Sequence, residues 1–402
     1  MRILLSEGSG LTSRQVAGQL AALGHEVEIL TSSKLCLTRF TRHVRAAHDV
    51  PRFGIDPFGW LAAAERIARE RKADLLFPTH EQVTVLSALQ DRLTLATIVP
   101  PFAGLVRVQD KISAFRTLGD LSAPQPRTVV ISSADDLRGI VTYPVFVKHP
   151  VSTASSGVRR AANALQLSAA ARDFGLGRTE LIVQSQAQGP LAMVQAVADR
   201  GRLVAHHACL RLREGVGGGA SLKESVVLRG LADILARLVS RLDWHGGLSM
   251  DVIVTDDGPL IIDVNPRLVE PANALASGVD LVAAMLDVAS DAPTQQRPTG
   301  QAGIRTHQTL LAILGAAEQG RTRRAILREA VLAVCARGAY ARSGEELTPI
   351  AGDPLAAIPV AVALAATLIH SPLWRKFHAG AVGPYALTPE AWKEIRAAAG
   401  NT

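Results

Sequence analysis

The sequence contains little cysteine and few aromatic residues. Its three cysteines, Cys36, Cys209 and Cys335, are too far apart along the chain to form a metal knuckle or a disulfide framework. We therefore expect reduced, mostly buried thiols and a cytoplasmic protein. Aromatic residues make up 4% of the chain, too few to provide stacking platforms for single-stranded nucleic acid.

The sequence also lacks a long hydrophobic run. The apolar run at 3–5 is too short for the core of a signal peptide. The most apolar stretch, 355–369, is short for a membrane span and is interrupted by Pro359. A buried or interfacial helix fits it better. We expect no membrane contact, and residues 355–377 are the one segment that leaves such contact open.

Lysine is scarce, because seven of the 43 basic residues are lysine and the other 36 are arginine. The formal net charge is +7, a balance that by itself would suit nucleic acid or a membrane surface. The arginines are spread along the chain, however, with only short clusters such as 321–324. We therefore expect small anionic ligands and no nucleic acid.

With 402 residues, of which 48% are hydrophobic, the chain is long enough for two or three domains. Its first hundred residues alternate short apolar runs with helical periodicity, which predicts a parallel sheet covered by helices. We expect strands at 2–5, 27–30, 74–77 and 97–99, and helices at 14–23, 57–72 and 84–91.

The rest of the chain changes character twice. From residue 110 to about 290 it is rich in strands, with a glycine-rich loop at 214–220 and an amphipathic helix predicted over 225–242. Residues 291–303 have the composition of a linker. The remainder is rich in Ala, Leu and Arg and is predicted to be mainly helical.

The most informative segment is a predicted hairpin from Leu248 to Val264. A three-residue loop at 256–258 would pair Thr255 with Pro259 and hence Asp251 with Asp263. Asn265 would then lie on the same face. Like charges directly opposite each other destabilise a strand pair, and a hard cation such as Mg²⁺ resolves the conflict. The alternative is a polar face that meets water.

The segment from Asp263 to Arg267, Asp-Val-Asn-Pro-Arg, with Asp251 upstream, resembles the last core motif of the ATP-grasp superfamily. The family commonly has Glu where Asp263 stands. The resemblance implies one or two Mg²⁺ ions, for which Mn²⁺ can substitute, held by Asp251, Asp263 and Asn265 against the phosphates of ATP. It also implies that Arg267 stabilises the transferring phosphoryl group.

The resemblance continues upstream in the order that the family shows. It implies that Lys111 and Lys148 contact the ATP phosphates, with Lys148 also near the adenine, and that a Ser/Gly loop closes over them. The segment at 181–187 matches the adenine hinge, with Gln184 where the family often has Glu. The implied ATP contacts are Lys111, Lys148, Ser155, Ser156, Gly157, Gln184, Ser185 and Ala187.

Contacts to the second substrate are less defined. Arg211 and Arg213 lie where the family has a basic residue that contacts either phosphate or a substrate carboxylate, and the sequence does not choose. His80 and Glu81 follow a strand at the end where open α/β sheets bind ligands, although a structural polar loop explains them equally well. Gly189 begins a Gly-Pro-Leu segment in place of an acidic motif.

Together these features predict a mixed α/β and α+β architecture. A Rossmann-like parallel α/β domain (1–109) precedes an ATP-grasp fold (110–290), with a small lid subdomain at about 125–187 and a large one at about 188–290. A helical region (291–402) follows; it could cap the site, form a homodimer interface or touch a membrane.

The resemblance implies an ATP-dependent carboxylate–amine ligase. Such an enzyme activates a small-molecule carboxylate as an acyl phosphate, joins it to an amine or similar nucleophile, and releases ADP and phosphate. Two alternatives remain open: a small-molecule kinase on the same fold, and a nucleotide-binding protein without catalysis.

Overall fold

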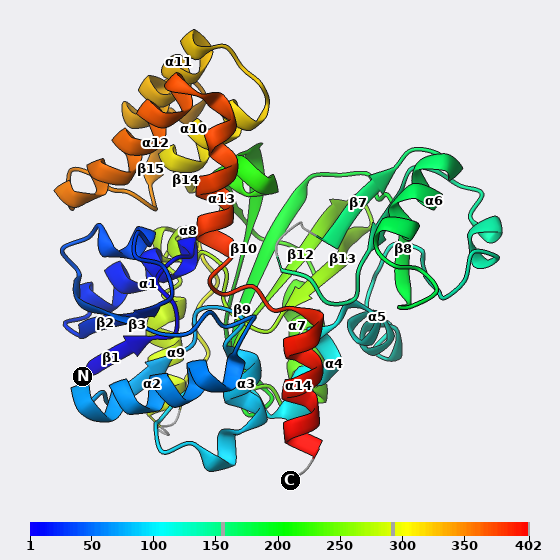
Figure 1. Ribbon diagram of the computed structural model, residues 1–402, viewed down its shortest axis with the longest axis horizontal. Helices are drawn as coiled ribbons and strands as arrows, with labels where there is room; N and C mark the ends of the chain where they lie inside the picture. The colour runs from blue at the N-terminus through cyan, green and yellow to red at the C-terminus, as the bar shows by residue number, and fades with distance from the viewer. Residues whose placement is uncertain (154–156, 291–293, 401–402) are drawn as a thin grey trace.

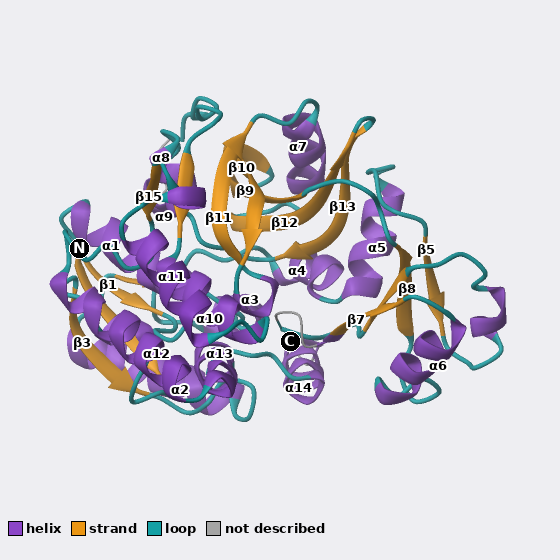
Figure 2. Ribbon diagram, turned by 90° about the horizontal axis from the view of Figure 1, so that it is seen from above, coloured by secondary structure: helices purple, strands orange, loops and turns teal. Residues whose placement is uncertain are grey.

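The computed structural model of the chain describes residues 1–153, 157–290 and 294–400. Three sheets surround the centre of the molecule. The C-terminal helices lie beside two of them, the N-terminal sheet and the largest sheet (Figures 1 and 2). The predicted mixed α/β architecture, with a parallel N-terminal sheet and a helical C-terminal region, is confirmed.

The N-terminal sheet is parallel, with the order β3-β2-β1-β4. Its strands are β1 (Arg2–Leu5), β2 (Glu26–Thr31), β3 (Val44–Asp49) and β4 (Leu75–Phe77). Its helices are α1 (Leu11–Ala22), α2 (Pro57–Arg71) and α3 (Val83–Ala88). The sequence did not predict β3, because its side chains are only partly buried and follow no apolar alternation. The strand expected at 97–99 is a single bridge between Leu76 and Thr97.

Two helices lead from this domain into a small antiparallel sheet. The helices are α4 (Phe102–Gln109) and α5 (Lys111–Asp120). The sheet has the order β5-β8-β6-β7, with β5 (Thr128–Ile131), β6 (Val145–Lys148), β7 (Val158–Ala161) and β8 (Leu181–Ser185). Helix α6 (Ala164–Asp173) packs against it through Leu167 and Ala171. The sheet lies within the predicted lid region.

The largest sheet has the order β13-β12-β9-β10-β11-β14-β15. Four of its strands are β9 (Leu191–Asp199), β10 (Arg202–Glu214), β12 (Gly246–Thr255) and β13 (Gly258–Asn265). The helix expected at 225–242 begins later, as α7 (Leu231–Arg241), because residues Ala220–Val226 form strand β11. Helix α7 packs its apolar face on this sheet, where Leu235 and Leu238 share a core with Val194 and Met250.

The β12–β13 hairpin differs from the prediction in its loop. Thr255 pairs with Gly258, so the loop has two residues, and the expected pairing of Thr255 with Pro259 is wrong by one position. A β-bulge at Ile262 then shifts the register, so that Asp251 still faces Asp263. The bulge therefore restores the predicted opposition of the two carboxylates.

The C-terminal region is mainly helical, as predicted. After α8 (Ala272–Ala276) and α9 (Leu281–Ala289) come α10 (Thr309–Glu318), α11 (Arg323–Val334), α12 (Ala357–Ile369), α13 (Trp374–Val382) and α14 (Pro389–Gly400). Two short strands, β14 (Arg305–His307) and β15 (Ser343–Glu345), were not predicted and extend the largest sheet. Across the described ranges, no helix has both the length and the apolar character needed to cross a bilayer.

The segment between α13 and α14 crosses the molecule and returns the chain end to the N-terminal domain (Figure 1). Phe53 N–H donates to Pro384 O at 3.4 Å, and Thr388 Oγ1 donates to Gly54 O at 2.9 Å. Trp392 of α14 is buried in the core that surrounds Trp60. The first and last parts of the chain thus form one body.

We predict that helix α10 tolerates no side chain at Gly315. A Cβ atom there would lie 2.8 Å from Gly215 Cα, in the backbone that leads from β10 to β11. Gly315→Ala should lower the free energy of unfolding by about 1–3 kcal/mol through overpacking. Gly18→Ala in α1, where nothing lies within 4 Å of the added Cβ, is the control. Urea denaturation would measure both, and equal effects would contradict the close approach.

Candidate active site

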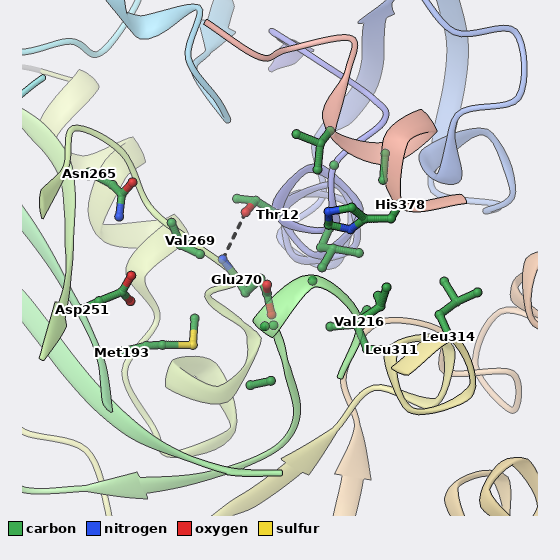
Figure 3. A pocket seen from close by; sticks show the side chains of 18 of the residues that line it. Thr12, Met193, Val216, Asp251, Asn265, Val269, Glu270, Leu311, Leu314 and His378 are labelled. Carbon is green, nitrogen blue, oxygen red and sulfur yellow. Dashed lines mark hydrogen bonds between the residues drawn. The ribbon is translucent and has the colours of Figure 1, made fainter. Parts of the chain in front are cut away.

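A cavity of about 1160 Å³ opens where the three sheets and the C-terminal helices meet. Small-molecule sites usually enclose roughly 300–1,000 Å³, so this cavity has room for more than one ligand. Figure 3 shows that Asp251 and Asn265 lie at one side of it, and that Leu311, Leu314 and His378 lie at the other.

The acidic side of the cavity contains the predicted metal ligands. Asp251 and Asp263 face each other across β12 and β13, and Asn265 lines the cavity two residues further on. Burial, and then the neighbouring Asp263 carboxylate, raise the pKa of Asp251 to about 6. Two partly buried carboxylates that face each other across a strand pair disfavour each other's ionised forms, and a cation would remove that cost.

These residues fit magnesium better than a metal that needs a complete protein cage. Among the residues that the structure describes, no three His, Cys, Asp or Glu side chains gather as a metal site. Mg²⁺ is usually held by one or two carboxylates and completes its octahedron with water and substrate phosphates. Two aspartates and an amide oxygen in an open cavity match that requirement.

The two predicted lysines converge on the same place. Lys111 is the first residue of α5, and its Nζ lies 3.3 Å from Asp263 Oδ2. Lys148 ends β6, and its Nζ donates to the carbonyl oxygen of Ile262, the bulged residue of β13, at 2.6 Å. Burial lowers the pKa of Lys148 to about 8, although Asp263 opposes this. Two cations therefore stand beside the paired aspartates.

The predicted adenine hinge also lines the cavity, at Gln184, Ser185 and Ala187. Gln184 is buried, and its Nε2 donates to Thr128 Oγ1 at 3.1 Å, which fixes its side chain between β8 and β5. Phe146 and Met193 add apolar surface nearby, as a planar base requires.

The structure describes part of the glycine–serine loop. Ser155 and Ser156 lie outside the described residues. Gly157 does not line the cavity, and its carbonyl oxygen accepts from His149 N–H at 2.8 Å. A Cβ atom at Gly157 would lie 2.4 Å from Ser152 Cβ, so the close approach of the loop's two ends requires a glycine.

The structure brings two predicted residues into direct contact. Arg267 Nη2 donates to Glu81 Oε1 at 3.0 Å, and Arg267 Nε lies 3.3 Å from the same oxygen. Their side chains are 10% and 6% exposed. Burial alone would lower the pKa of Arg267, but the Glu81 carboxylate outweighs it and the pKa rises. The guanidinium is therefore charged and held in one orientation at the edge of the cavity.

His80 lines the cavity beside this ion pair and is 2% exposed. Its ring stacks on Tyr385, with centroids 4.0 Å apart, and its Nδ1 lies 3.0 Å from Thr79 Oγ1. Burial, and then the charge of Arg267, hold the pKa of His80 well below its usual range, so the ring is neutral at pH 7. A Cβ atom at Gly10, the residue before α1, would lie 1.9 Å from His80 Nε2, so a side chain there would displace the ring.

The two arginines of β10 separate. Arg211 lines the cavity, where its Nη1 donates to Gly218 O at 2.5 Å and its Nη2 lies 3.3 Å from Glu214. Arg213 does not line the cavity, because the register of β10 against β11 shifts between the two residues. Its Nη2 bonds to Glu329 Oε1 at 2.8 Å, on α11.

Sequence reasoning missed a second set of residues at the site. Glu270 lines the cavity with its backbone in the left-handed region (φ 52°), and its carboxylate accepts from Lys223 Nζ at 2.5 Å. Lys223 also donates to Glu346 Oε1 at 2.6 Å. These three residues lie far apart in the sequence. Two features could have drawn attention to them: the scarcity of lysine, and the position of Glu270 three residues after Arg267.

Comparison with known proteins agrees with this geometry. Residues 108–271 match the family model of the ATP-grasp domain, so the prediction of such a domain in the middle of the chain is confirmed. No curated protein sequence matches the chain.

Solved structures show the same fold at low sequence identity. The biotin carboxylase domain of Hydrogenobacter thermophilus 2-oxoglutarate carboxylase is 16% identical, with a TM-score of 0.60 over 76% of this chain and 73% of that one. Biotin carboxylase from Campylobacter jejuni is 16% identical, with a TM-score of 0.60 over 76% and 74%. N5-carboxyaminoimidazole ribonucleotide synthetase from Thermus thermophilus is 19% identical, with a TM-score of 0.56 over 76% and 81%.

We predict that the Arg267–Glu81 pair is costly to break. Glu81→Ala would leave a buried guanidinium without its partner, which should lower the free energy of unfolding by about 3–5 kcal/mol. Glu70→Ala removes the exposed i,i+4 partner of Arg66, 3.0 Å away, and should change it by less than about 0.5 kcal/mol. Chemical denaturation would compare the two, and a small effect of Glu81→Ala would show that water reaches Arg267.

Proposed function

We propose that this protein is an ATP-dependent ligase that uses Mg-ATP to activate a small-molecule carboxylate and joins it to an amine or similar nucleophile. The observation that supports this most strongly is the meeting of Asp251, Asp263, Lys111, Lys148 and Arg267 in one cavity of an ATP-grasp fold. We further propose that it works in the cytoplasm.

Each group has a role in this proposal. Asp251, Asp263 and Asn265 would hold one or two Mg²⁺ ions, with Mn²⁺ able to substitute, and the metal would neutralise phosphate charge. Lys111 and Lys148 would bind phosphate oxygens, and the hinge residues Ser185 and Ala187 would bind the adenine edge. The two biotin carboxylases of similar fold support this nucleotide assignment, because one was solved with MgADP and the other as a complex with β-γ-ATP.

The reaction has two steps. A carboxylate oxygen of the substrate attacks the γ-phosphorus of ATP, the bond to the bridging oxygen breaks, and ADP leaves. The nucleophile then attacks the acyl carbon, phosphate leaves, and the nucleophile loses its proton. Arg267, which Glu81 holds in place at the cavity, would stabilise the negative charge that develops in both steps. The chain supplies positioning and charge rather than a covalent nucleophile.

The alternatives differ in what they need. A small-molecule kinase on the same fold would stop after the first step. A non-catalytic nucleotide-binding protein is favoured only by the departures at Gln184 and Gly189 from the family pattern. The intact set of lysines, aspartates and Arg267 around one cavity favours catalysis. The biotin carboxylases and the ribonucleotide synthetase of similar fold favour the ligase over the kinase.

Metal-dependent ATP binding is the first test. Calorimetry should find ATP affinity in the micromolar range with Mg²⁺ and much weaker affinity without it. Asp263→Ala should weaken the Mg²⁺-dependent affinity about tenfold or more, because it removes one of two carboxylates that would hold the ion. Asp257→Ala, at the exposed turn of the same hairpin, should leave it unchanged. Absence of ATP binding to the wild type would refute the proposal.

The second test separates ligase from kinase. ADP release would be followed while acids are screened with and without amines. A ligase releases ADP steadily only when both substrates are present, whereas a kinase needs the acceptor alone. Arg267→Met should lower kcat by about 10²–10³, as loss of a transition-state charge does. Arg213→Met, outside the cavity, should leave kcat within about twofold. ADP release that no acid stimulates would contradict the ligase assignment.

A further inference from the structure

The cavity continues beyond the acidic site into a region lined mainly by apolar side chains, with His378 of α13 among them. Leu310, Leu311 and Leu314 of α10 form its inner wall, and they share a hydrophobic core with Val216 from the turn between β10 and β11 (Figure 3). The outer wall comes from α12, α13 and an N-terminal loop and includes Ile358, Val362, Phe377, Leu35 and Leu37. We call this region the apolar compartment.

ATP does not account for the apolar compartment. The predicted adenine contacts are in β8 and the hinge that follows it, and the predicted phosphate contacts converge on Asp263. Leucine side chains such as Leu311, 2% exposed, offer nothing to a triphosphate. The helices that form much of this wall lie outside residues 108–271, which match the ATP-grasp domain. The compartment therefore belongs to whatever this particular chain binds besides the nucleotide.

Arg211 lies at the boundary between the two regions. It lines the cavity together with Asp251 and Asp263, and its positive charge partly offsets the rise in the pKa of Asp251, which places it near the metal side. Its Nη1 bonds to Gly218 O, and a Cβ atom at the adjacent Gly219 would lie 3.0 Å from Leu311 Cδ2, which places it beside the apolar wall. A cation between an anionic reaction site and an apolar pocket suits a molecule with a carboxylate at one end and an apolar group at the other.

We propose that the acid substrate is such a molecule: a carboxylic acid with an alkyl chain or apolar ring, bound by Arg211 at its carboxylate and by the apolar compartment at its other end. This rests on the proposed function, because it names the substrate of the same site. Three side chains at the mouth, Leu35, Ile358 and Val362, are 81%, 43% and 52% exposed. A membrane or a second copy of the chain could cover such a mouth. Neither would contact the enclosed wall around Leu311 or the Arg211 guanidinium beside it.

The test measures binding rather than turnover. Calorimetry of the full chain without nucleotide would use straight-chain acids from acetate to decanoate, below their micelle concentrations, and the matching alkylamines. Each buried methylene should tighten acid binding about fourfold until the compartment is full. The amines should bind at least about tenfold more weakly than acids of equal length, because Arg211 repels them.

Three variants locate the binding. Val362→Trp should weaken long acids about tenfold and leave acetate unchanged, because the indole occupies the compartment. Ala361→Trp, at an exposed neighbouring position of α12 that does not line the cavity, is its control and should change neither. Arg211→Met should weaken every acid by a similar factor, whatever its chain length. Circular dichroism would confirm that the variants fold.

The outcomes separate the two proposals. Three results would each overturn the proposal of an apolar acid substrate: affinity that does not depend on chain length, equal loss of affinity in Val362→Trp and Ala361→Trp, or amines that bind as tightly as acids. Each would do so even if short polar acids stimulate ADP release. Sedimentation with and without decanoate would also test the proposal. Dimers of the wild type that Val362→Trp abolishes would overturn it, because a second copy would then cover the mouth. Chain-length-dependent binding of acids that stimulate no ADP release, with or without amines, would support the compartment and contradict the ligase.

Discussion

The opposition of Asp251 and Asp263 across one strand pair is the constraint around which the site is organised. Two carboxylates facing each other cost stability unless positive charge lies close by. The chain provides that charge from two other elements, α5 through Lys111 and β6 through Lys148. The bulge at Ile262 serves both purposes, since it sets the register of the aspartates and presents the carbonyl oxygen that orients Lys148.

Buried ion pairs also join the parts of the chain to one another. Arg267 and Glu81 link the strand-rich core to the N-terminal sheet, and Lys223 links Glu270 to Glu346 in the C-terminal region. Such pairs add little net stability over well-packed apolar residues, but they penalise any arrangement that separates the partners. They therefore fix how the three parts are placed, and the cavity lies where they meet.

The sequence predicted the local features well and the distant ones poorly. The facing aspartates followed from strand alternation, and they survived an error in the hairpin loop because the bulge compensated for it. Strand β3 was not predicted because its residues show no apolar alternation. Strands β14 and β15 were not predicted because a three-residue strand shows almost no periodicity. Arg211 and Arg213 are two residues apart, so a regular strand would place both side chains on the same face. Only the register shift seen in the structure separates them.

The crossing segment after α13 has a consequence for how the protein matures during synthesis. Gly380, Ala381, Val382 and Tyr385 line the cavity, and Tyr385 covers His80 from a position more than three hundred residues later in the chain. A nascent chain that has emerged only as far as α12 can form all three sheets and pair both aspartates, yet its cavity still lacks this wall. The cavity therefore acquires this wall only after residues 380–385 have been synthesised, so shorter nascent chains carry the nucleotide motifs without the finished site.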